Sequence, residues 1–168
     1  IMATRSGLLR ADGWISDTDG SSPLRFFGIS EGLYHIAIRH RNHLGIMTDF
    51  PTILGSAPLP MDFTTSNQAT YGTSARKIIG NTYMLWAGDV NHDGVIKYTG
   101  GGNDPNDRDF ILQAIGGVVP TNSIAGYMKE DVNLDGEAKY TGQFNDRDYI
   151  LQNIGGVVPT NTRQAQLP

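Results

Sequence analysis

The sequence contains no cysteine among its 168 residues. A disulfide framework is therefore excluded, and redox chemistry says nothing about the compartment. No run of apolar residues approaches the roughly 20 that a membrane-spanning helix needs, so we expect no membrane insertion. Only 18% of the residues are charged and the net charge is -4, which provides no basic face for nucleic acid. We expect no nucleic-acid partner.

Turn-forming residues are abundant, with 21 glycines and 8 prolines alongside 39% hydrophobic residues. This content is enough for a packed core, and it favours short strands over long helices. We predict a mainly β fold, with a small β-sandwich over residues 1–80 and a second region over residues 81–168. Short β-rich segments separated by turns occur at residues 4–10, 23–27, 33–39, 44–48 and 61–65.

The second region contains a duplicated stretch that begins Asp-Val-Asn-x-Asp-Gly, first at Asp89 and again at Asp131. Alternate oxygen-bearing side chains followed by glycine are what a calcium ion needs from a backbone wrapped around it. The two copies span about residues 88–122 and 130–161. We predict two calcium ions rather than magnesium, because magnesium prefers a smaller octahedral shell and retains its waters.

In the first copy, side-chain oxygens at loop positions one, three and five face one ion, and a carbonyl at position seven adds a ligand. A standard loop of about twelve residues would close at Gly100, which has no side chain to coordinate. If residues 97–105 are an insertion, a helix-capping asparagine and the aspartate three residues later take the closing positions. The predicted ligands of the first ion are Asp89, Asn91, Asp93, Val95, Asn106 and Asp109.

The second copy has a shorter insertion, at residues 139–144, and the same closing motif follows it. A change of loop length around a fixed motif is what a preserved site would tolerate. The predicted ligands of the second ion are Asp131, Asn133, Asp135, Glu137, Asn145 and Asp148. Each loop leads into a short helix, at residues 110–115 and 149–154, which a Gly-Gly pair ends. We predict no helix before either loop, so each unit is half of an EF-hand.

This loop-helix arrangement resembles the duplicated calcium segments of type I dockerins, over about residues 88–160. Dockerins bind cohesins through exposed helix residues, commonly a Ser-Thr pair. The corresponding positions here carry Asp107-Arg108 and Asp146-Arg147, which counts against cohesin as the partner.

A closer resemblance covers nearly the whole chain. The stretches Asp-Val-Asn-x-Asp-Gly, Lys-Tyr-Thr-Gly and Asn-Asp-Arg-Asp, together with residues 38–45, resemble the C-terminal calcium-repeat region of large secreted bacterial surface proteins. That resemblance implies an extracellular or cell-surface location in a bacterium. Millimolar calcium outside cells, which keeps weak sites filled, favours the same location.

The β region also resembles a prealbumin-like module, over residues 26–36. The chain begins at Ile1 rather than methionine, and three explanations stay open. Ile1 is a processed terminus, or the chain is part of a longer protein, or the sandwich lacks its first strand. In the third case a strand from a neighbouring subunit would fill the open sheet edge, and we would expect strand-mediated self-association.

Other chemistry has little support in the sequence. His35, His40 and His43 suggest a zinc cluster, but a strand would place His35 and His40 on opposite faces. Neither a nucleophile elbow nor a phosphate-binding loop occurs, and we predict no enzyme. The predicted function is a non-enzymatic extracellular calcium-binding structural protein, in cell-surface structure, adhesion or a fibre. The alternative is a dockerin-like module, appended to a secreted enzyme, that binds a cell-surface protein or glycan.

Overall fold

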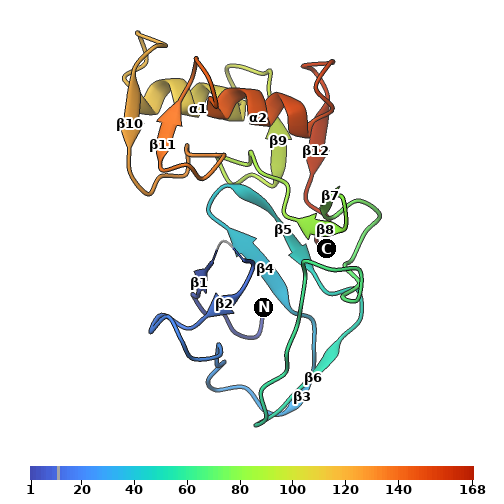
Figure 1. Ribbon diagram of the computed structural model, residues 1–168. Coiled ribbons are helices and arrows are strands. Elements are labelled where there is room, and N and C mark those ends of the chain that lie inside the picture. The colour runs from blue at the N-terminus through green and yellow to red at the C-terminus, as the bar shows by residue number, and fades with distance from the viewer. Residues whose placement is uncertain (11) are drawn as a thin grey trace.

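A computed structural model describes residues 1–10 and 12–168 of the chain (Figure 1). The described residues form short strands and two helices of 8 residues each, which confirms the predicted mainly β character. None of the described helices is both long enough and apolar enough to cross a membrane. The elements are β1 (Leu8–Leu9), β2 (Ile15–Ser16), β3 (Gly32–Tyr34), β4 (Ala37–His40), β5 (His43–Met47), β6 (Thr52–Leu54), β7 (Lys77–Ile79), β8 (Thr82–Met84), β9 (Val95–Lys97), α1 (Asp107–Ala114), β10 (Ser123–Ala125), β11 (Glu137–Lys139), α2 (Asp146–Asn153) and β12 (Thr162–Gln164).

The strands pair two by two, as β1–β2, β3–β6, β4–β5, β7–β8, β9–β12 and β10–β11. All of these pairs are antiparallel. Among the described residues, no sheet has more than two strands, so the two facing sheets of a sandwich stay a prediction. The pair β3–β6 lies at the opposite end of the molecule from the helices, and the hairpin of β4 and β5 reaches towards the repeats (Figure 1).

The strand predicted over residues 33–39 is divided between β3 and β4. The cause is a corner built around Thr48, which is buried. Its hydroxyl accepts a hydrogen bond from Ile36 N at 3.1 Å, and its carbonyl lies 2.9 Å from His35 Nδ1. Because these contacts interrupt the ladder, β3 and β4 pair with different partners, and one continuous strand does not form.

The two repeats exchange strands. Strand β9 lies in the first loop but pairs with β12, which follows the second helix. Strand β11 lies in the second loop and pairs with β10, which follows the first helix. Two side-chain hydrogen bonds also connect each loop to the segment after the other helix. Thr99 Oγ1 donates to Pro159 O, and Thr141 Oγ1 donates to Pro120 O. Each repeat is therefore completed by the segment that follows the other.

The core lies mainly in the repeat region. Its buried residues are Leu44, Val90, Ile96, Ile111, Val132, Ile150 and Ile154. Only Leu44 of this cluster comes from the first 80 residues. Ile111 of α1 and Ile150 of α2 are equivalent in the two copies and are both fully buried, as the predicted apolar helix faces require. The helices thus anchor both loops on one shared core.

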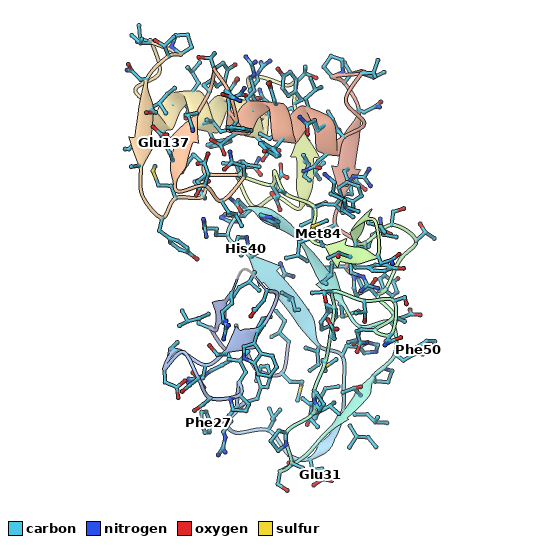
Figure 2. All side chains as sticks on the ribbon, viewed as in Figure 1. Phe27, Glu31, His40, Phe50, Met84 and Glu137 are labelled. Atoms are coloured by element: carbon cyan, nitrogen blue, oxygen red, sulfur yellow. The ribbon has the colours of Figure 1, made fainter. Side chains whose placement is uncertain are left out.

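The outer part of the first half leaves large apolar side chains in solvent. Phe27 is 70% exposed and Phe50 71% exposed, and both project outward in Figure 2. Leu33 of β3 and Ile53 of β6 face each other in register and are 64% and 66% exposed. A two-stranded pair with an uncovered apolar face is marginal by itself in water.

Candidate metal centre

The first loop folds around its own predicted ligands. Asp89 Oδ2 accepts a hydrogen bond from Gly94 N at 3.2 Å, and Asn91 Oδ1 accepts one from Asp93 N at 2.9 Å. Asp93 Oδ1 in turn accepts one from Val95 N at 2.8 Å. These local bonds tie the side chains at positions one, three and five to the backbone of the same turn.

The second loop repeats this geometry. Asp131 accepts backbone N–H groups from Asp135 and Gly136, both at 3.1 Å, and Asn133 Oδ1 accepts from Asp135 N at 2.8 Å. Asp135 Oδ1 accepts from Glu137 N at 3.0 Å. The match between the two copies shows that their shared residue types dictate the loop conformation.

Position four in both loops has a left-handed backbone that non-glycine residues seldom adopt. His92 has φ of 62° and Leu134 has φ of 65°. Such conformations cost about 1 kcal/mol or more and persist only where the surroundings impose them. Both loops are therefore held in a defined shape by the contacts around them.

The strongest of these contacts come from Asp107 and Asp146, which were not among the predicted ligands. Asp107 is fully buried, and its carboxylate accepts N–H groups from Val90 at 2.7 Å, Asn91 at 3.3 Å and Lys97 at 2.7 Å. Each carboxylate therefore clamps the beginning and the end of its loop to the start of the following helix.

The second clamp is equivalent. Asp146 is also fully buried and accepts N–H groups from Val132 at 2.7 Å, Asn133 at 3.1 Å and Lys139 at 2.7 Å. Burial raises the pKa of Asp146 to about 6 and that of Asp107 to about 7, against the opposing effect of the backbone donors. The sequence signal for these residues was present, since both copies have Asn-Asp-Arg-Asp and therefore two aspartates each.

The predicted closing residues lie at the helix starts. Asn106 is the N-cap of α1, its side chain accepts from Asp109 N at 3.0 Å, and its amide donates to Asp109 Oδ2 at 2.9 Å. Asn145 and Asp148 repeat both bonds at the start of α2. The predicted caps are confirmed. Coordination through Asp109 and Asp148 stays a prediction, because each carboxylate contacts its cap and the preceding arginine.

Lysine side chains neutralise part of each loop. Lys97 Nζ lies 3.7 Å from Asp93 Oδ2 and 2.6 Å from Asp104 Oδ1. Lys139 Nζ lies 3.3 Å from Asp135 Oδ2 and 3.1 Å from Glu137 Oε2. The carboxylate of Glu137 also accepts from Ser123 Oγ. Position five is thus ion-paired in both copies.

Position one of the first loop, unlike position five, has no ion pair among the described residues. Asp89 is 5% exposed, and its Oδ1 is buried with no hydrogen-bond partner among the described residues. Burial and the neighbouring charge of Asp93 raise the pKa of Asp89. A buried carboxylate oxygen without a partner is costly, and a bound cation removes that cost. The donor set of carboxylates, amide oxygens and a carbonyl suits a hard cation such as calcium.

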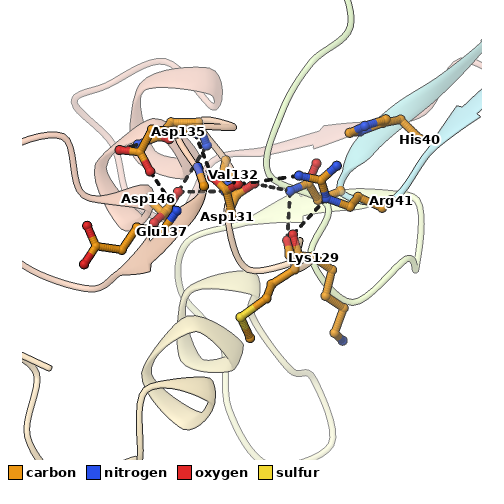
Figure 3. A network of polar contacts seen from close by, with 12 residues as sticks. His40, Arg41, Lys129, Asp131, Val132, Asp135, Glu137 and Asp146 are labelled. Carbon is orange, nitrogen blue, oxygen red and sulfur yellow. Dashed lines mark hydrogen bonds and ion pairs between the residues drawn. The ribbon is translucent and has the colours of Figure 1, made fainter. Parts of the chain in front are cut away.

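The tip of the β4–β5 hairpin joins the two loops. The Asn42 side chain is fully buried and donates from Nδ2 to Lys129 O at 2.9 Å and to Asp131 O at 2.6 Å. The backbone carbonyl of Asn42 accepts hydrogen bonds from Gly88 N at 2.8 Å and Asp89 N at 3.1 Å. One residue therefore contacts position one of both loops, and Figure 3 shows this tip reaching the second loop.

The histidines of the hairpin form a pair. His40 Nδ1 lies 3.0 Å from His43 Nδ1, which also lies 2.7 Å from Asn42 Oδ1. Burial lowers the pKa of His43 to about 3, which keeps its ring neutral. His40, His43 and His92 line a cavity of about 220 Å³ with Asp89. Across the described part of the chain, however, no three His, Cys, Asp or Glu side chains come together as a metal site. A zinc cluster therefore gains no support, and since the described carboxylates of the two loops do not form such a group either, their calcium sites stay a prediction.

Comparisons with known proteins add no relative. No family model matches the chain, and neither a curated protein nor a solved structure matches it.

Proposed function

We propose that the protein is a non-enzymatic calcium-binding structural module, in which two ions stabilise the duplicated loop-helix region in the manner of dockerin-like half EF-hands. The observation that carries this proposal is the buried oxygen of Asp89 that has no partner among the described residues, in a loop where Asn91 and Asp93 bond to the backbone of the same turn. Calcium would replace that missing partner. A small core without disulfides gains most from such a metal.

An extracellular or cell-surface location of a bacterium follows from this proposal. Loops with several carboxylates but lysine counter-charges suit weak calcium sites, which fill at the millimolar calcium found outside cells. The chain also lacks cysteine, so calcium is the only structural cross-link that its motifs suggest.

A calcium titration followed by calorimetry tests the metal. We expect two bound ions per chain at saturation and one fewer in Asp89→Asn, because the neutral amide removes a charged ligand from position one of the first loop. Asp12→Asn is a matched control, since Asp12 is an exposed aspartate whose side chain pairs with Arg10. The proposal fails if the unaltered chain binds no calcium.

We also propose that the module self-associates through its first 80 residues, as a fibre or adhesion subunit. The uncovered apolar face at Leu33 and Ile53 supports this, because the same face of a second copy packed against it would remove both side chains from water, as in the two facing sheets of the predicted sandwich. Sedimentation velocity at rising protein concentration should show larger species that Ile53→Lys abolishes. A monomer at all concentrations would instead favour the dockerin-like binding module.

A further inference from the structure

The two loops have the same residue types at positions one, three and five, yet their position-one aspartates have different surroundings. Asp89 Oδ2 accepts a hydrogen bond from Gly94 N at 3.2 Å, and its Oδ1 is buried with no hydrogen-bond partner among the described residues. Asp131 accepts backbone N–H groups at both oxygens, and its Oδ2 also lies 3.5 Å from Arg41 Nη2. The second loop therefore already has a cation beside its first ligand (Figure 3).

The position of Arg41 is fixed by more than this ion pair. Its Nε donates to Met128 O at 2.8 Å, and its guanidinium lies 3.8 Å from the centre of the Tyr127 ring. The side chain is 18% exposed, and that of Asp131 is 2% exposed. A charge pair this shielded from water is screened little by salt. Arg41 is therefore a fixed neighbour of the second loop.

A carboxylate has about four lone-pair positions. Two hydrogen bonds occupy lone pairs of Asp131, and the Arg41 guanidinium forms an ion pair with one of the same oxygens, whereas Asp89 has a hydrogen bond at Oδ2 and, among the described residues, no such cation. An ion entering the second loop must share Asp131 with a guanidinium of like charge. An ion entering the first loop meets an oxygen that lacks any partner. The same sequence motif thus presents two unequal sites.

We propose that Arg41 is the resident cation of the second loop and makes this loop the weaker of two calcium sites. This inference rests on the proposed calcium function. Arg41 adjoins Asn42, which contacts both loops. A calcium ion that enters the second loop repels Arg41 and so weakens the contacts by which Asn42 holds the hairpin against the repeats. Calcium at the second loop and docking of the hairpin then oppose each other, and the opposition is reciprocal.

Calorimetric titration of the full chain with calcium alone tests this assignment. We expect two sites of unequal affinity, with the tighter site missing in Asp89→Asn and the weaker site missing in Asp131→Asn. Arg41→Met keeps a long side chain over Tyr127 but removes the charge, and it should tighten the weaker site roughly tenfold, within the usual range of coupling. Arg41→Lys keeps the charge and should leave the weaker site weak.

Each outcome has a separate meaning. If the chain binds no calcium, the proposed function itself fails. If two ions bind with equal affinity, or if Arg41→Met leaves both affinities unchanged, the assignment of Arg41 is overturned while the calcium function stands. If Arg41→Met does not fold, the two aspartate variants still test which loop binds calcium more tightly. Survival of the tighter site in Asp89→Asn would overturn the assignment of Arg41.

Discussion

Replacement of Asp107 by alanine is expected to lower the free energy of unfolding by about 4 kcal/mol, because one buried and two partly buried backbone donors lose their acceptor. The donors are the N–H groups of Val90, Asn91 and Lys97, which hold both ends of the first loop. Denaturant unfolding in the presence of a calcium chelator, followed by tryptophan fluorescence, measures the effect without a contribution from bound metal.

Asp109→Ala is the matched control, two residues further along the same helix. The Asp109 side chain is 43% exposed and contacts the Asn106 cap, so its loss should cost only about 1 kcal/mol without calcium. Asp146→Ala should behave like Asp107→Ala, since its contacts are equivalent. If Asp109→Ala destabilises the metal-free protein as much as Asp107→Ala, the role assigned to the buried clamp is wrong.

Removal of calcium is expected to have an effect of similar size. At the millimolar calcium that fills weak sites, with a free concentration about 10 times the dissociation constant, an ion that binds only the folded chain contributes about 1.4 kcal/mol, so two ions contribute about 3 kcal/mol. For a chain of 168 residues this corresponds to a melting temperature lower by roughly 10 °C. Thermal unfolding in millimolar calcium and in excess chelator provides the comparison.

Magnesium at the same concentration should not restore the higher melting temperature, since the long loops do not impose its compact octahedral shell. In Asp89→Asn the chelator should lower the melting temperature by less, because one site no longer contributes. Identical unfolding curves with calcium and with chelator would show that the loops need no metal to fold.

Local structure in the repeats was predictable from the sequence, because neighbouring residues determine it. Asn106 and Asn145 each precede a helix and cap it, and the turns at positions one, three and five depend on side chains two to five residues away. The role of Asp107 was not predictable in this way. A sequence pattern shows which residues offer oxygen atoms, but not whether an oxygen faces an ion or a backbone N–H group.

Long-range contacts explain the remaining differences. Residues 123–125 and 162–164 form strands with little strand signal of their own, because each meets an open edge in the other repeat. Asn42 lies in the turn between β4 and β5. Its burial depends on an acceptor 89 residues away, Asp131 O, which no local pattern reveals.

The exchanged strands also make each repeat depend on the other. Because β10 completes the second loop and β12 completes the first, one loop-helix unit followed by its own strand leaves its edge unpaired. Two separate chains of that single unit would complete each other in the same way, as a symmetric dimer. In this chain the two units are joined covalently, so each repeat has its partner at hand at any protein concentration, although the two insertions differ in length.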